Sequence, residues 1–241
     1  MPEPLDPSID VPIRAAATVI VVRDRPGGGL ETLLLRRSAD LAFHGGSWVF
    51  PGGRIDAEDH HPDRPEDLDH AAAQAAAREA REEADVQVEI DDLLPFAHWT
   101  TPPGRARRFA TWFFLAPLRA HVAHGEISVD GSEIDDHLWV TPDEALQRHA
   151  SGEVELPAPT FVSLTRLRSY RDVADAVARV PTEPYRRFNP RAVNLDGSWV
   201  ATLYDGDAAF ELDPVDLDAP GPRNRIWLTE LPWRYEFHGL D

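Results

Sequence analysis

Clusters of apolar and β-branched side chains predict strands in the first half of the chain. Residues 14–22 (RAAATVIVV) form one such run, and residues 30–37 (LETLLLRR) form another after a turn rich in Pro and Gly. Runs of this kind, bounded by turn residues, are typical of a hairpin. The same signal predicts short strands at residues 47–50, 86–90, 96–100, 107–115 and 138–140.

Helices are indicated by a different pattern. Residues 70–84 (HAAAQAAAREAREEA) consist almost entirely of strong helix formers. Residues 142–149 begin with Pro, which is favoured in a first helical turn, and residues 160–180 predict a longer helix or a helix pair. Further along, residues 198–204 and 208–212 flank Asp-Gly-Asp and predict a hairpin, followed by a strand at 225–228.

This order of elements predicts an α+β fold, because strands and helices do not alternate strictly. We expect an extended segment at residues 1–13, a main domain at 14–150, and an extension of helix and short strands at 151–241. A chain of 241 residues is long enough to bury a sizeable core.

Composition excludes several classes of function. The net charge is −18, so a nucleic acid polymer would be repelled. All 24 basic residues are Arg, which excludes a lysine-containing phosphate loop, and the absence of Cys excludes thiolate catalysis and Cys-ligated zinc. The acidic, Pro-rich N-terminus lacks the pattern of a secretory signal, and no apolar run is long enough to span a membrane. We therefore expect a cytoplasmic protein without membrane partners.

The helix at residues 70–84 carries the most informative polar pattern. Glu79, Glu82 and Glu83 are spaced i, i+3 and i+4, so their carboxylates share one face. Such a face is also typical of a solvated helix, but the Ala-rich remainder indicates close packing. The preceding Gly52-Gly53 pair allows backbone to approach a ligand. Clustered carboxylate oxygens are ligands that Mg²⁺ prefers.

Together these residues resemble the Nudix box, a Gly followed by an R-E-x-x-E-E helix. The matching positions are Gly53 and residues 78–83. The resemblance implies an α/β/α sandwich with a mixed sheet that binds Mg²⁺ or Mn²⁺. It implies that Glu82 and Glu83 are metal ligands together with the carbonyl of Gly52 or Gly53. It also implies that Glu79 is a further ligand or the base for water, and that Arg78 orients a carboxylate.

Two departures from the box are visible. Asp85 stands where the box has Gly, and Asp tolerates a left-handed helix cap better than most residues. The interval between Gly53 and Arg78 is also longer than in the box, which indicates an insertion between Asp56 and Asp69. The mid-box Glu is therefore unassigned, with three candidates to replace it, namely Asp56, Glu58 and Asp59; a solvated acidic loop is the alternative.

Residues 33–59 and 99–114 resemble coenzyme A diphosphatases of the Nudix superfamily, including a branch with an inserted box. Arg37 belongs to the first stretch, and the Arg-rich loop of the second predicts a phosphate clamp by Arg105, Arg107 and Arg108, although ion pairing to nearby acids is the alternative. Glu133, with Asp135 behind it, is the candidate acid that reaches the metals from outside the box.

The implied function is metal-assisted hydrolysis of a diphosphate inside a nucleoside diphosphate derivative, with coenzyme A or acyl-coenzyme A as the leading substrate. ADP-ribose or other sugar nucleotides and nucleoside triphosphates are alternatives. A catalytically inactive, nucleotide-sensing module is a rival of a different class, which the complete set of carboxylates disfavours. Residues 181–241 are a candidate homodimer surface.

Overall fold

A computed structural model describes residues 6, 8–39, 45–118, 133–195, 197–229 and 231–240. Of the predicted N-terminal segment at residues 1–13, residues 1–5 and 7 lie outside the described residues. The chain divides into two compact units. The larger unit comprises Ala15–His98 and Thr111–Arg186, and the smaller unit comprises Met1–Arg14, Trp99–Ala110 and Arg187–Asp241.

The main sheet has eight strands in the order β3-β2-β1-β6-β5-β8, with β4 paired to β1 and β7 paired to β2. β2 pairs antiparallel with β1, β3 and β7, and β4 runs antiparallel to β1. The predicted strands at residues 14–22, 30–37, 47–50, 96–100, 107–115 and 138–140 are thereby confirmed. The strands are β1 (Ile13–Asp24), β2 (Leu30–Arg37), β3 (Trp48–Val49), β4 (Gly52–Arg54), β5 (Leu94–Thr100), β6 (Arg108–Pro117), β7 (Ile134–Val140) and β8 (Arg186–Phe188).

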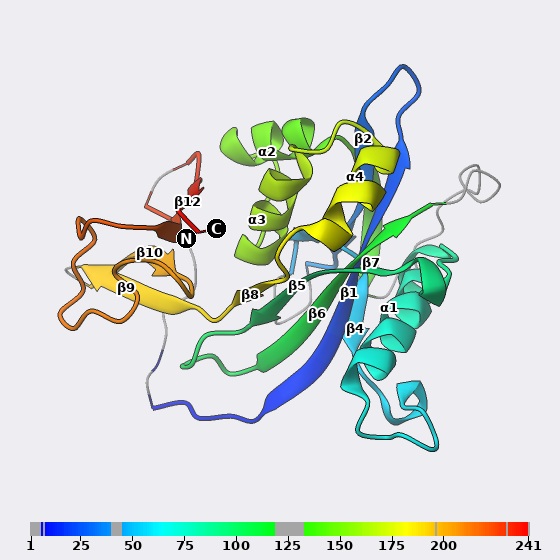
Figure 1. Cartoon of the computed structure of the whole chain (residues 1–241), viewed down its shortest axis with the longest axis horizontal. Helices are drawn as coiled ribbons and strands as arrows, with labels where there is room; N and C mark the ends of the chain where they lie inside the picture. Colours follow the sequence, from blue (N-terminus) through cyan, green and yellow to red (C-terminus); the bar gives the residue numbers. More distant parts are fainter. Residues whose placement is uncertain are drawn as a thin grey trace. The chain divides into compact units, whose positions relative to one another are not determined.

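Helices lie on both sides of this sheet, as Figure 1 shows: α1 (Leu68–Ala84) on one side, and α2 (Pro142–Ala150), α3 (Ala158–Leu167) and α4 (Val173–Arg179) on the other. The two predicted helices and the predicted helix pair are confirmed. The alanine face of α1, which includes Ala76 and Ala80, packs on alternate apolar residues of β1 and β2. Among these strand residues are Val19, Val21 and Leu33. Because both faces of the central strands are buried, the α+β sandwich predicted from the sequence is confirmed.

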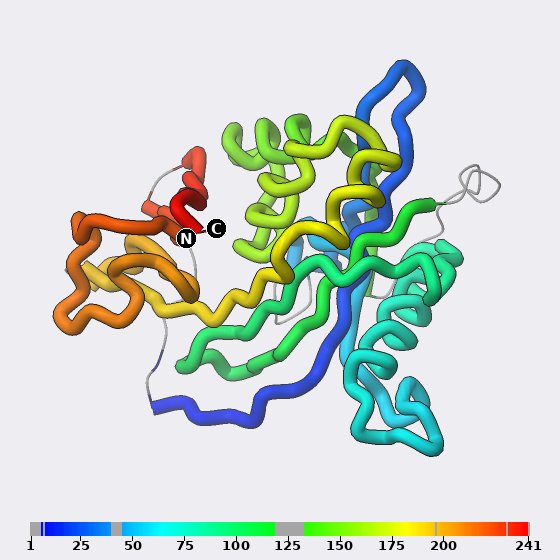
Figure 2. The backbone as a smooth tube through the Cα atoms, in the orientation of Figure 1, coloured from blue at the N-terminus to red at the C-terminus, as the bar shows by residue number. Residues whose placement is uncertain are grey.

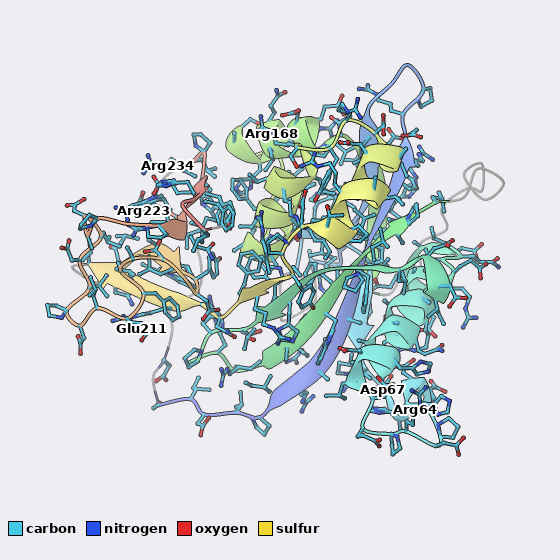
Figure 3. All side chains as sticks on the ribbon, viewed as in Figure 1. Arg64, Asp67, Arg168, Glu211, Arg223 and Arg234 are labelled. Carbon is cyan, nitrogen blue, oxygen red and sulfur yellow. The ribbon has the colours of Figure 1, made fainter. Side chains whose placement is uncertain are left out.

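The two ends of α1 are set by aspartates. The Asp67 carboxylate accepts a hydrogen bond from the His70 N–H at 3.1 Å and caps the first turn. Figure 3 labels Asp67 and Arg64, which form an ion pair at 3.2 Å in the loop before the helix. Asp85 ends α1 in the left-handed conformation, with φ 52° and ψ 32°, as the sequence predicted for this position.

The predicted strand at residues 86–90 is wrong. The Val86 N–H donates back to the Ala80 carbonyl and completes the helix cap, while its side chain packs into the core below α1. The chain then turns through the 3₁₀ helix Ile90–Asp92, so β5 starts only at Leu94. Helix capping and core packing thus outweigh the strand preference of this short apolar run.

The smaller unit contains an antiparallel sheet in the order β12-β11-β10-β9. Its strands are β9 (Arg191–Leu195), β10 (Ser198–Leu203), β11 (Arg223–Trp227) and β12 (Arg234–His238), so the predicted strands at 198–204 and 225–228 are confirmed. The predicted strand at 208–212 is wrong. The buried Asp207 carboxylate accepts from the Ala209 and Asn224 N–H groups and holds this segment in turns, and β10 pairs with β9 and β11 instead.

Figure 2 traces the chain from β4 through a long loop into the start of α1. This loop contains the 3₁₀ helix Ala57–Asp59 and a bridge between His61 and Arg64, so the inserted residues have defined local structure. Over the described ranges, none of the helices is long and apolar enough to cross a bilayer.

Candidate active site

The three glutamates of α1 differ in exposure. Glu83 is buried, with 6% of its surface exposed, because it lies beside the sheet at the last turn of the helix. The Glu79 side chain is 14% exposed, whereas the Glu82 side chain is 52% exposed. The predicted common face is therefore not an open solvated surface, since two of its carboxylates are pressed against the protein.

Gly52 and Gly53 lie directly against these carboxylates. The Gly52 N–H donates to Glu83 Oε2 at 2.9 Å. A Cβ atom added at Gly53 would lie 2.2 Å from Glu79 Oε1, and one added at Gly52 would lie 2.5 Å from the Ala17 carbonyl oxygen. β4 pairs with β1 at this point, so neither glycine can retreat. A side chain at Gly52 would collide with the β1 backbone, and one at Gly53 would displace the Glu79 carboxylate, so the two glycines let the β4 backbone approach the carboxylates.

Arg78 lies at the centre of the carboxylate cluster, and the two sides of its guanidinium group donate hydrogen bonds to different acids. Nε and Nη2 donate to Asp59 Oδ1 at 3.1 Å and Oδ2 at 2.9 Å, and Nη2 also donates to the Arg54 carbonyl at 3.0 Å. Nη1 donates to Glu79 Oε1 and to Glu82 Oε2, each at 3.0 Å. One arginine therefore contacts two of the three glutamates, and its role in orienting a ligand carboxylate stays a prediction.

The electrostatics of the site reflect crowded negative charge. Burial raises the pKa of the Glu83 carboxyl to about 8, and the neighbouring Glu79 adds to this while the Gly52 hydrogen bond opposes it. Burial also raises the pKa of Glu79 against the attraction of Arg78. The hydrogen bond to Asp59 is the main reason why the pKa of Arg78 is raised. A bound cation would relieve the repulsion among these carboxylates.

Arg37 and Glu133 extend the site from the ends of two paired strands. Arg37 ends β2 opposite Ile134 of β7, and its Nη2 atom lies 4.0 Å from Glu133 Oε2. Burial, the Gly52 hydrogen bond and Glu79 have the largest effects on the pKa of Glu83. Arg37 also lowers this pKa and Glu133 also raises it, so both charges act on the buried carboxylate. Asp135, the alternative to Glu133, instead pairs with Arg36 at 2.6 Å.

The chemistry of the site suits a hard divalent cation. It offers carboxylate oxygens of Glu79, Glu82 and Glu83, and the backbone of Gly53 approaches them without an intervening side chain. Within the described ranges, no three acidic or His side chains already converge as a complete ligand set. Glu79 and Glu82 accept from Arg78 instead, so a cation would have to share or replace those bonds.

The three arginines predicted as a phosphate clamp belong to the smaller unit. The Arg105 guanidinium lies 5.3 Å from the centre of the Trp199 ring, and Arg108 Nε donates to the Thr101 carbonyl at 3.3 Å. Arg107 is exposed. Their part in phosphate binding stays a prediction.

Comparison with known proteins agrees with this geometry. The sequence profile of the NUDIX domain matches residues 12–158, which is more than half of the chain. The chain belongs to the Nudix family. Helix α1 and the Gly52-Gly53 bend lie within the matched residues and carry the Nudix box with its insertion.

Individual Nudix proteins are similar over shorter stretches. An acyl-coenzyme A diphosphatase NUDT19 from Gallus gallus is 38% identical over 129 residues, covering 52% of this chain and 32% of that protein. The NUDT19 of Xenopus laevis is 30% identical over 56% of this chain and 35% of its own length, so the chain spans about a third of these relatives. A solved Nudix hydrolase from Alicyclobacillus acidocaldarius is 27% identical, with a TM-score of 0.62 over 72% of this chain and 99% of that one.

Two features of this Nudix site were not predicted from the sequence. The hydrogen bond from Gly52 to Glu83 had no signal beyond the glycine pair itself. Asp59 was one of three acids that the sequence left open, and its bidentate contact with Arg78 depends on how the inserted loop folds. A short Asp-x-x-Asp turn, from Asp56 to Asp59, is the local signal that could have singled it out.

Proposed function

We propose that this Nudix protein hydrolyses the diphosphate linkage of a nucleoside diphosphate derivative, with coenzyme A or an acyl-coenzyme A as substrate and Mg²⁺ or Mn²⁺ as cofactor. The observation that carries the proposal is the packing of Glu79 and Glu83 against the side-chain-free surface of Gly52-Gly53. The similarity to acyl-coenzyme A diphosphatases supports the choice of substrate, and it covers about half of the chain.

Glu79, Glu82 and Glu83, with the Gly53 carbonyl and Glu133, are the residues that would hold the cation. When bound, the cation would neutralise diphosphate charge and lower the pKa of water. Arg78 keeps Glu79 and Glu82 in place through its Nη1 atom. Arg37, beside Glu83 and Glu133, is positioned to attract a substrate phosphate, and a guanidinium group suits that ligand.

If Glu79 does not bind the cation, it is the proposed base for water, and otherwise another acid takes that role. The base would accept a proton from the attacking water as the new P–O bond forms. The bond between phosphorus and the bridging oxygen then breaks, and the bridging oxygen leaves with the other phosphate, giving two phosphate monoesters.

The test is a hydrolysis screen with purified full chain, coenzyme A, acetyl-coenzyme A, ADP-ribose and nucleoside triphosphates, each with Mg²⁺, Mn²⁺ or chelator. We expect cation-dependent release of two monoesters, fastest from a coenzyme A compound. Faster cleavage of ADP-ribose or a triphosphate would favour those substrates. Binding of nucleotides without any cleavage would favour the inactive sensing module.

Two further expectations belong to this proposal. A cytoplasmic location stays a prediction, and fractionation of cells that express the chain would check it. Dimerisation through residues 181–241 also stays a prediction, and light scattering of the purified chain would give the mass directly.

A further inference from the structure

The inserted loop between β4 and α1 delivers a buried carboxylate to Arg78. Asp59 ends the 3₁₀ helix and is 5% exposed, although the residues around it are polar. Its Oδ2 atom accepts from the Asp56 N–H at 2.8 Å, and its own N–H donates to the Asp56 carbonyl at 3.1 Å. This closed turn fixes Asp59, so the carboxylate direction is set by the loop itself.

Asp59 also satisfies the Nε–Nη2 edge of Arg78 completely, through two hydrogen bonds in the fork geometry. Burial would raise the pKa of Asp59, but the hydrogen bonds from Arg78 and from the Asp56 N–H outweigh it and leave the pKa lowered. The carboxyl group is therefore ionised near neutral pH and remains a full partner for the arginine.

The other two candidate acids of the loop do not make this contact. The Asp56 carboxylate is 3.9 Å from Arg78 Nη2 and is 49% exposed, and it adds at most a weak attraction. Glu58 is exposed on the outside of the same turn. Of the three acids that could replace the missing mid-box Glu, Asp59 has the geometry of a fixed partner.

We propose that Asp59 is a positioning residue for the metal site. By accepting hydrogen bonds from the Nε–Nη2 edge of Arg78, it directs Nη1 towards Glu79 and Glu82 and so orients their carboxylates for a divalent cation. The inference rests on the proposed function in that it assumes that these glutamates bind the cation. It gives the insertion a role, because the loop brings back a carboxylate that the interrupted box lacks.

The first experiment measures Mn²⁺ binding to the full chain by electron paramagnetic resonance of the free ion. We expect Asp59→Asn to weaken Mn²⁺ binding about 10–100-fold, the range typical of residues that orient metal ligands. Asp59→Glu, which keeps the charge, should recover part of the loss. Asp63→Asn is the matched control, since this exposed aspartate lies in the same loop, and it should bind Mn²⁺ like the wild type.

A purely structural role makes a different prediction. In that case Asp59→Asn would lower the melting temperature, but the folded protein would bind Mn²⁺ as tightly as the wild type. That outcome overturns the proposal.

A second experiment needs no variant and can still contradict the proposal if Asp59→Asn does not fold. Nitrogen-15 NMR of the wild type follows hydrogen exchange of the Arg78 Nε–H with and without Mg²⁺. We expect slow exchange in both states, because Asp59 holds this edge while Glu79 and Glu82 bind the ion. Rapid exchange in the Mg²⁺-bound state would contradict the proposal.

The two proposals fail in different ways. If Mn²⁺ binding depends on Asp59 but no diphosphate is cleaved, the proposed activity is wrong and the positioning role stands. If coenzyme A is hydrolysed but Asp59→Asn binds Mn²⁺ normally, the activity stands and the positioning role is wrong.

Discussion

Each unit of the molecule contains an arginine held in a fork by a buried aspartate, and the surroundings of the two pairs differ. In the smaller unit, Arg225 Nε and Nη2 donate to Asp207 at 2.8 and 2.5 Å, and Nη1 donates to the Leu217 carbonyl at 2.7 Å. The side chains of this pair are 1% and 0% exposed. Each of the three guanidinium nitrogens donates one hydrogen bond, and the acceptors are one carboxylate and one carbonyl.

Around Arg78 in the larger unit, carboxylates outnumber the arginine. Asp59, Glu79 and Glu82 all accept hydrogen bonds from it. Glu83 belongs to the same cluster and accepts a hydrogen bond from the Gly52 N–H. In the smaller unit, one arginine thus faces one carboxylate and the charges cancel. In the larger unit, one arginine faces several carboxylates and negative charge is in excess. The Asp207–Arg225 pair is balanced and holds the turns around it, whereas the cluster around Arg78 leaves negative charge for a cation to neutralise.

The largest effect is expected from removing the excess charge. Glu82→Gln combined with Glu83→Gln should lower kcat by about a thousandfold or more, because cation stabilisation of the transition state is worth several kcal/mol. The fold should persist, since the amides keep the shapes of the side chains. Steady-state kinetics and circular dichroism check this, with exposed Glu89→Gln as the control. Full turnover by the double variant would rule out the site.

Breaking the balanced pair should affect stability. Asp207→Asn leaves Arg225 buried beside a neutral group, so the free energy of unfolding should fall by about 3–5 kcal/mol. Urea denaturation measures the loss, and Asp218→Asn, an exposed residue in the same loop region, is the matched control. A stability equal to that of the control would mean that the buried pair is not needed to hold the turns at 205–222.

A smaller loss is expected from filling the space beside the carboxylates. Gly53→Ala places a methyl group 2.2 Å from Glu79 Oε1, so Glu79 must move and Mg²⁺ affinity should fall about 10–100-fold. Titration calorimetry measures the affinity. Adding Glu79→Ala should remove the steric conflict, and the double variant should then be more stable than Gly53→Ala alone. Additive destabilisation would contradict the predicted contact.

The two sites should also respond to pH in opposite senses. The pKa of Glu83 is raised to about 8 in the folded chain, so the folded state binds this proton more tightly than the unfolded state does. The stability that comes from the bound proton is complete below the ordinary pKa of 4.5 and is lost as the pH rises towards 8. Asp207, whose pKa is lowered by Arg225 despite its burial, contributes above its ordinary value of 3.8 and loses that contribution on acidification.

In metal-free protein, the free energy of unfolding should therefore decline by at least ~1 kcal/mol between pH 5 and 8, since one unit of pKa shift is worth about 1.4 kcal/mol. Glu83→Gln should abolish most of the decline, and saturating Mg²⁺ should reverse it. Urea denaturation at each pH measures the trend. An unchanged slope in Glu83→Gln would show that another group is responsible.

Local signals in the sequence were enough for much of this picture. Helix α1, its end at Asp85 and the face shared by Glu79 and Glu83 follow from short-range spacing, which a single chain displays directly. The sequence left Asp59 as one of three candidates and missed the turns at 208–212, because each involves a buried aspartate that pairs with an arginine 18 or 19 residues away. Strand propensity carries no information about such pairs.

Anomalous diffraction from crystals of the full chain soaked in Mn²⁺ locates a bound cation without any variant. We predict a manganese peak within about 2.0–2.3 Å of carboxylate oxygens of Glu82 and Glu83, with Glu79 and the Gly53 carbonyl around it, distances typical of hard cations. Strong peaks elsewhere, with none beside α1 and the Gly52-Gly53 bend, would contradict it.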